Sequence, residues 1–434
     1  MGGLILGLIA SQSLMDLFAV ITTGLGLWLL VKDQEKTFWC EYKNKFYVCS
    51  TWLLFLFFGL FLQRVKGLDS LSDIFIAPNK SGVGFKSLKD FLWMLQLPIW
   101  SYLWLKGRWS QRWIKIVLIL LLLVSLYSVI IYILGFDPLL QHWSDRTENA
   151  RYLWRSGGLF SNAMALAQSY GPLCMLLLPL TVFYLVEAYH NFLRYRWSGL
   201  FPTSLSWLVP LVFLITLLAV LFTFTRGVWM ALVLTTLLAS FIHRRKWALS
   251  VLVVMILGGA TLLSVWPKFR ERTLLVFDTQ KGYDSERLVV WKTNWFIFTE
   301  NPIAGIGYSE NHRRLREYYD YLGVPKGQFE GHAHNQFLHF LAGTGLIGFL
   351  FYLGWCIYFL KITYFIYRHS FLENRPVEKY FGFGLFLAQV SFHIGSLTES
   401  NFSIAKNRLL MVILWSLALA MYYRLNHSRN SSLK

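Results

Sequence analysis

A short polar segment with two histidines opens a long apolar run near residue 334. His332, His334 and Asn335 stand just before an apolar stretch that continues to about residue 360. Read as a helix, the stretch has His334 and Asn335 in its first turn, where unpaired N–H groups and the helix dipole disfavour positive charge. A neutral imidazole can accept a proton, and such N–H groups can receive an anion. The pattern predicts a base beside an anion site, although a histidine that only caps a helix also fits it.

Two arginines stand where they could hold such an anion. Arg226 interrupts an apolar stretch from 205 to 242 that is too long for one span, so we expect the chain to reverse there, with Arg226 at the membrane surface. An ionisable residue in that place is a functional candidate, and its alternative role is that of an end anchor. Arg408 opens the last apolar run and could close the site from the other side.

A third arginine, Arg287, lies in a segment with helical signals. Asp284 or Ser285 can cap the start of a helix, and Asn301-Pro302 ends it. Apolar residues recur at helical spacing within it, which predicts an amphipathic helix lying on the bilayer surface. Arg287 near the positive end of this helix could add to an anion site, and a plain surface role is the alternative.

Further polar side chains are expected on the same membrane face. Asn162 precedes a span and could supply an amide, and Arg155 is one of many arginines there. Glu399 stands between the last two spans, where a carboxylate could orient an imidazole, balance the arginines or remain a solvated loop residue. Because the guanidinium fork suits phosphate oxygens, this face is predicted to hold phosphate, with contacts to lipid phosphates as the alternative. The outer loops show no cluster of carboxylates for a divalent metal.

Membrane-spanning helices must position these residues. The chain has 434 residues, of which 56% are hydrophobic and 18% aromatic. Apolar runs of about 18 or more residues recur along it. They predict an all-α, polytopic membrane protein with eleven spans, or twelve if residues 4–10 also enter the bilayer. The expected spans lie near 12–31, 46–63, 88–105, 113–135, 159–186, 205–224, 226–242, 247–266, 334–360, 380–397 and 407–423.

Short basic loops set the expected orientation. They fall on one side of the membrane, which the positive-inside rule makes the cytoplasm. These loops are 32–45, 106–112, 194–196, 243–246, 361–379 and the tail after 424.

The chain is then expected to divide into three parts. A transmembrane helix bundle covers 1–266, an external loop with amphipathic helices covers 267–333, and C-terminal transmembrane helices cover 334–434. The net charge of +18 is shared between two membrane faces, which excludes nucleic acid as a partner. The four cysteines have no metal-ligand spacing and imply no disulfide framework.

One motif in the chain resembles the O-antigen ligase family, within a superfamily that also holds O-antigen polymerases and protein O-oligosaccharyltransferases. The motif is His334-Asn335, nine intervening residues, and Gly345-Leu-Ile-Gly348.

Two arginines extend the resemblance, which is firmest over about 220–350. Arg226 in Thr-Arg-Gly corresponds to the family's arginine before its outer loop. Arg287, ahead of a Trp and of an Asn-Pro-x-x-Gly-x-Gly turn, corresponds to its loop arginine.

The resemblance implies a metal-independent, inverting glycosyltransferase with a GT-C-like fold and no cofactor, in the bacterial inner membrane. It would act on the periplasmic side, moving a glycan from undecaprenyl diphosphate to a sugar hydroxyl of lipid A–core oligosaccharide. His334 would be the base that takes the hydroxyl proton, and Arg226 and Arg287 would stabilise the leaving diphosphate. Weaker candidates for substrate binding are Asn335, Arg408, Glu399, His332, Arg155 and Asn162.

Other functions compete with this one. An O-antigen polymerase uses the same carrier and would lengthen its glycan, and a protein glycosyltransferase remains open. A flippase for lipid-linked glycans would place charges through the bilayer midplane, whereas here they gather at the surface.

Overall fold

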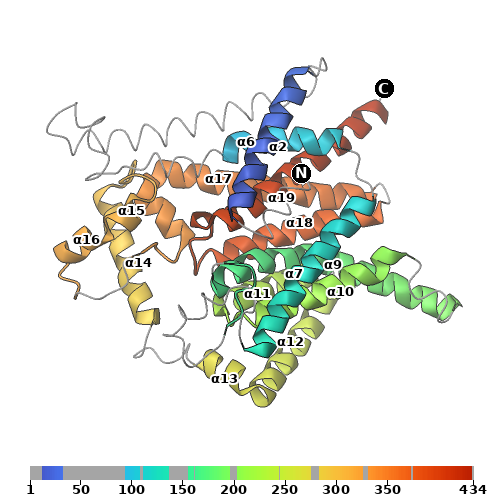
Figure 1. Ribbon diagram of the computed structural model, residues 1–434, viewed down its shortest axis with the longest axis horizontal. Helices are drawn as coiled ribbons and strands as arrows, with labels where there is room; N and C mark the ends of the chain where they lie inside the picture. The colour runs from blue at the N-terminus through green and yellow to red at the C-terminus, as the bar shows by residue number, and fades with distance from the viewer. Residues whose placement is uncertain are drawn as a thin grey trace.

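The chain is built from helices (Figure 1). The computed structural model describes residues 12–32, 93–107, 111–135, 155–160, 162–195, 203–243, 245–274, 283–325, 331–372 and 375–432, and no strand occurs within them. The longer helices are α2 (Gln12–Lys32), α6 (Trp93–Lys106), α7 (Gln111–Leu134), α9 (Ala163–Tyr195), α10 (Ser204–Leu221), α11 (Arg226–His243), α12 (Arg245–Val265), α14 (Tyr283–Glu300), α17 (Gln336–Leu372), α18 (Pro376–Gly395) and α19 (Ala405–Ser432). The short ones are α13 (Pro267–Leu274), α15 (Glu310–Arg313), α16 (Leu315–Tyr321) and the 3-10 turn η4 (Asn401–Ser403).

Seven helices in these segments are long and apolar enough to cross a membrane: α7, α9, α10, α11, α12, α17 and α19. Large apolar side chains stand exposed along them, such as Leu249, Ile256 and Leu257 on α12. Such a surface suits the lipid interior, where every backbone polar group must be satisfied within the helix. The protein is therefore an all-helical, multi-pass membrane protein.

Ten of the eleven predicted spans coincide with a described helix. Seven of these are the helices long and apolar enough to cross a membrane, and the other three are α2, α6 and α18. The eleventh, 46–63, and the apolar piece at 4–10 lie outside the described residues. The chain turns between the end of α10 at Leu221 and Arg226, the first residue of α11, as predicted.

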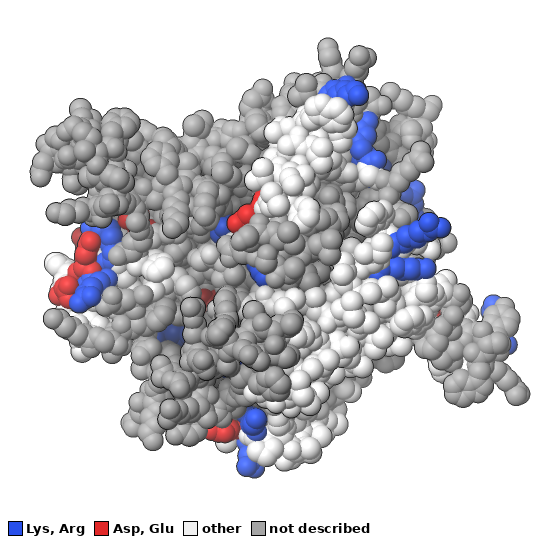
Figure 2. All heavy atoms as spheres, viewed as in Figure 1, with Lys and Arg blue, Asp and Glu red and all other residues white. Residues whose placement is uncertain are grey.

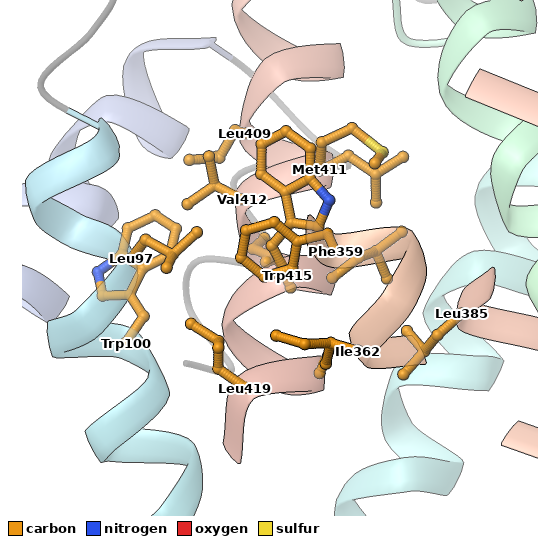
Figure 3. Close-up of a cluster of buried hydrophobic side chains, with 14 of the residues drawn as sticks. Leu97, Trp100, Phe359, Ile362, Leu385, Leu409, Met411, Val412, Trp415 and Leu419 are labelled. Atoms are coloured by element: carbon orange, nitrogen blue, oxygen red, sulfur yellow. The ribbon is translucent and has the colours of Figure 1, made fainter. Parts of the chain in front are cut away.

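Two hydrophobic clusters hold the bundle together. In one, α6, α17, α18 and α19 meet around Trp100, Phe359 and Trp415 (Figure 3). The Phe359 and Trp415 rings stack with centroids 5.0 Å apart. The other cluster joins α7, α9, α10 and α11 to α18. Because α18 contributes to both clusters, it connects the two groups of helices.

Helices α14, α15 and α16 gather at one end of the molecule, beside the start of α17 (Figure 1). Val290 of α14 is fully buried against Leu315 and Tyr319 of α16. The charged segment 309–322 forms two short helices, α15 and α16, which meet at Arg314. This end carries the candidate residues around His334.

Candidate active site

Glu399 lies between two imidazoles in the loop that follows α18. Its Oε2 is 3.1 Å from Nδ1 of His334, and its Oε1 is 3.2 Å from Nε2 of His332. The glutamate side chain is only 1% exposed, whereas His332 is 27% and His334 15% exposed. The carboxylate is thus enclosed, while both rings reach the surface.

The hydrogen bonds fix which ring nitrogens carry protons. A carboxylate only accepts hydrogen bonds, so Nδ1 of His334 donates to Glu399. His332 Nδ1 in turn accepts the backbone N–H of His334 at 3.4 Å. In this tautomer Nε2 is the nitrogen of His334 that can accept a proton. The geometry therefore suits His334 to act as a base.

His332 is held in its neutral form. Burial lowers the pKa of His332 to about 4, and the Glu399 carboxylate only partly offsets this lowering. Three neighbouring basic groups lower this pKa further: His334, His312 and Arg287. A neutral His332 can accept the His334 backbone N–H, so its protonation state and the backbone geometry agree.

Glu399 is held in its charged form. Burial acts to raise the pKa of its carboxyl, but the hydrogen bond from His334 and the electrostatic influence of the two neighbouring histidine rings outweigh burial. The backbone N–H of Ser400, 3.1 Å from Oε1, also favours the carboxylate. The pKa of Glu399 consequently lies below its ordinary value.

The start of α17 differs from the prediction in two ways. The helix begins at Gln336, so His334 precedes it and has a left-handed backbone with φ 46°. Such a conformation is rare for residues other than glycine and concentrates at functional sites. Asn335 caps the helix, because its Oδ1 accepts the N–H groups of Phe337 (3.0 Å) and Leu338 (3.1 Å).

The predicted anion site on these N–H groups is wrong. Besides the two that Asn335 accepts, the N–H of Gln336 donates to Ser396 O at 2.8 Å, and that of His339 donates to Asn335 O at 2.9 Å. The first-turn donors of α17 are therefore already used. An anion at this end must be held by side chains.

Gly345 breaks α17 within the predicted continuous span. Its φ of 62° and ψ of −169° are non-helical. The turn after α14 docks into the break, where Leu346 N donates to Pro302 O at 2.7 Å and Gly307 N donates to Gly343 O at 2.8 Å. A Cβ on Gly345 would lie 2.3 Å from Ile303 O. Glycine at these positions permits the close approach of the two backbones.

Arg226 comes from α11, whose first turn packs on the Glu399 loop. A Cβ on the next residue, Gly227, would lie only 2.0 Å from Thr398 Oγ1. Glycine at this position lets α11 begin directly against the residue that precedes Glu399. The structure thus brings the Arg226 helix start and the Glu399 loop together.

Arg287 comes from the second turn of α14. Its charge acts on the pKa of His332, which places it within electrostatic reach of the cluster. The α14 helix is fixed to α17 through a buried chain of polar groups. Asn311 Nδ2 donates to Asn294 Oδ1 at 2.6 Å and lies 3.0 Å from His339 Nδ1. Arg287 and the start of α17, which directly follows His334, are therefore held by packed helices.

The remaining predicted residues make structural contacts. Arg155 binds the turn before Arg226, through Nε to Thr223 O at 2.6 Å and NH2 to Thr225 Oγ1 at 3.0 Å. Asn162 caps α9, since its Oδ1 accepts the N–H of Ala165 at 2.7 Å. Arg408 donates to Phe402 O in the turn after Glu399.

Two residues near the cluster were not singled out from the sequence. Thr398 contacts Gly227, and the ring of His312 on α15 lies 6.4 Å from that of His332. Polar character alone does not distinguish them from loop residues. Their roles depend on contacts between distant segments.

The cluster has the composition of a metal site. One donor atom each from His332, His334 and Glu399 lies within 4.8 Å of the others. Two imidazoles and a carboxylate are ligands that zinc accepts, so these residues could hold a metal. Sequence spacing does not reveal this set, because its carboxylate lies 65 residues from His334.

Comparison with known proteins bears on this end of the molecule. A search of curated proteins finds no match. Residues 211–353 match the model of the family described as O-antigen ligase, a segment that contains Arg226, Arg287 and the two histidines but not Glu399. Such a match implies a glycosyltransferase-type enzyme that uses lipid-linked glycans. Over residues 211–353, this chain has a domain of the O-antigen ligase family, whose members carry out glycan transfer of the ligase or polymerase type.

Proposed function

We propose that the protein moves a glycan from undecaprenyl diphosphate to a sugar hydroxyl of lipid A–core oligosaccharide, on the periplasmic side of the bacterial inner membrane. One observation carries the proposal: the His334–Glu399 hydrogen bond of 3.1 Å, which directs Nε2 to accept a proton. The family match over 211–353 supports glycan transfer as the reaction.

The proposed reaction is a single displacement. The hydroxyl oxygen of the acceptor bonds to the anomeric carbon while its proton passes to His334 Nε2. The bond between that carbon and the diphosphate oxygen breaks, and the diphosphate leaves with the electron pair. Attack opposite the leaving group inverts the anomeric carbon. The imidazolium then returns its proton to water.

Charge stabilisation falls to the arginines. The departing diphosphate gains negative charge in the transition state, and preorganised guanidinium groups stabilise it in a poorly hydrated site. Arg226 and Arg287 are assigned this role because the start of α11 packs on the Glu399 loop and the charge of Arg287 acts on His332. Glu399 orients His334 and neutralises its charge as the proton arrives. Asn335, Arg155 and Arg408 support the backbone around these groups.

The experiment combines purified protein, lipid-linked glycan and lipid A–core in detergent or vesicles. The proposal expects glycan joined to the core. His334→Ala should reduce transfer by about 100-fold or more, while His369→Ala, at the far end of α17, keeps it. Near-normal transfer by His334→Ala in folded protein would reject the assignment of the base. Longer glycan on the carrier would instead indicate a polymerase, and no new bond would indicate transport.

A further inference from the structure

A separate cavity lies between the C-terminal half of α9 and the adjoining ends of α17 and α18. Its volume is about 530 Å³, within the usual range for small-molecule sites. Glu187 and His190 of α9 form one wall, and Arg375 and Lys379 at the start of α18 form another. Ser370 of α17 also lines it. No residue of the histidine cluster takes part.

The polar groups of the cavity are separated by sign. Arg375 caps the start of α18 and Lys379 lies in its first turn, where the helix dipole adds positive potential. Glu378, 3.4 Å from Arg375, does not line the cavity. Glu187 faces the same cavity from α9. An occupant with a negative and a positive group fits this arrangement better than a simple anion.

Ser370 supplies a second, independent sign of a ligand. Its side chain is fully buried, and its Oγ has no hydrogen-bond partner within the described segments. Buried hydroxyls are normally paired, because an unpaired one costs free energy. A phosphate oxygen in the cavity could accept its hydrogen bond.

The depth of the cavity points to a lipid. The 25 residues from Gly345 to Ser370 span about 38 Å at about 1.5 Å per residue, more than the roughly 30 Å hydrocarbon core. This segment is long enough to cross the core, and with its start on the His334 side we infer that Ser370 lies in the headgroup layer of the other leaflet. Val186 lines the cavity and is 49% exposed, and Val182, one turn earlier, is 48% exposed. This apolar strip on α9 can contact acyl chains.

We propose that this cavity binds the headgroup of a membrane phospholipid that carries a primary amine. The phosphate binds Arg375, Lys379 and the Ser370 hydroxyl, the ammonium group binds Glu187, and the acyl chains lie along α9. The proposal does not depend on the reaction at the other end of the protein.

Native mass spectrometry of the full-length protein in detergent tests this site. Phosphatidylethanolamine, phosphatidylglycerol, phosphatidylcholine and inorganic phosphate are added separately. The wild type should retain phosphatidylethanolamine at least several-fold better than the other three. Arg375→Gln/Lys379→Gln should lose retention of all the lipids. Glu187→Gln should lose only the preference for the amine, and Arg368→Gln, an exposed cation outside the cavity, should behave as wild type.

Several outcomes would overturn the proposal. Equal retention of the three lipids, or retention unchanged in the Arg375/Lys379 variant, would rule out a specific headgroup site. Preference for phosphatidylglycerol would rule out the amine contact. Strong binding of inorganic phosphate without lipid would replace the lipid with a soluble anion. Thermal unfolding with each lipid shows whether a variant is folded.

Discussion

At the scale of single residues, Glu399 determines the state of two imidazoles. It accepts a hydrogen bond from His334, lies 3.2 Å from Nε2 of His332, and is itself 1% exposed. Because a carboxylate cannot donate, Nδ1 of His334 must carry hydrogen, and His334 presents Nε2 as its acceptor. The proton of a neutral His332 lies on Nε2, since its Nδ1 accepts the backbone N–H of His334. The same arrangement, a carboxylate that orients a histidine base, recurs in enzymes that activate hydroxyl groups.

Replacing Glu399 by Gln tests this positioning role. The Gln amide can donate to Nδ1 of His334, which moves the ring proton to Nε2 and removes the base. We expect kcat for glycan transfer to fall by about 10- to 100-fold, with little change in KM for the donor. Glu378→Gln, an exposed carboxylate on α18, is the matched control. If KM rises while kcat stays the same, Glu399 contacts substrate instead.

His332 predicts a dependence of stability on pH. Its pKa of about 4 in the folded protein lies below the ordinary value of 6.5. The unfolded chain therefore binds more protons between these values, and stability falls as pH drops through that window. The lowered pKa of Glu399 adds a loss of stability in the same direction below its ordinary value of 4.5.

Thermal unfolding of wild type and His332→Gln measures this effect. Between about pH 6.5 and 4.5 the midpoint of the wild type should fall more steeply, because Gln does not titrate. Equal slopes in the two proteins would contradict the assignment of a neutral His332.

The sequence alone identifies some of the candidate site residues more clearly than others. His334, Arg226 and Arg287 stand out because a polar group interrupts or adjoins an apolar pattern. For Glu399 the sequence leaves three roles open, and orienting an imidazole is one of them. It cannot decide among them because the contact with His334 depends on where α18 ends in space. The anion site at the start of α17 was wrong because Asn335 takes the N–H groups that the prediction left open.

At the scale of elements, the break in α17 positions its first segment. Gly345 has φ 62°, and the backbone of Ile303 and Ala304 fills the place of a side chain. The turn from 301 to 307 can therefore dock into the helix and connect α14 to α17. Arg287 and His334 reach the same end through this joint.

Gly345→Ala should disrupt the joint. A positive φ costs about 1–3 kcal/mol for a residue with a side chain, and the contact with Ile303 O adds to this cost. We expect a lower unfolding midpoint and a several-fold loss of transfer activity. Gly354→Ala is the matched control in the same helix, where a Cβ meets nothing within 4 Å. It should leave the midpoint unchanged or raise it, since alanine favours helices. Equal effects of the two substitutions would show that the break has no special role.

Apolar periodicity in the sequence predicts where the helices lie, but it does not predict where a helix is interrupted. The break at Gly345 leaves the apolar run intact, so the run alone predicts a continuous span. The division of 309–322 at Arg314 likewise follows from packing of Leu315 and Tyr319 under α14. Both depend on neighbours that are distant in sequence.

At the scale of the whole molecule, acidic and basic side chains are distributed differently at the two ends of the helices (Figure 2). Figure 2 shows acidic and basic side chains interleaved over the α15–α16 end, and mainly Lys and Arg along the upper right-hand edge. Composition was enough to predict a multi-pass membrane protein, because apolar length requires it. The packing order, with α18 between α9 and α17, could not be read from hydropathy.

The orientation of the protein in the membrane can be predicted and tested at the scale of the whole molecule. We expect α16 outside and the end of α17 in the cytoplasm, since the basic loops should remain inside. Glu317→Cys and Arg368→Cys, both at exposed positions, report on the two ends. Cys40 and Cys49 are first replaced by Ser, whereas Cys174 and Cys356 are buried. In spheroplasts, a membrane-impermeant maleimide should label the Glu317→Cys variant at once and the Arg368→Cys variant only after lysis. The reverse pattern would put the histidine cluster in the cytoplasm, where a carrier presented in the outer leaflet could not reach it. Labelling of both variants from one side would mean that α17 does not cross the bilayer.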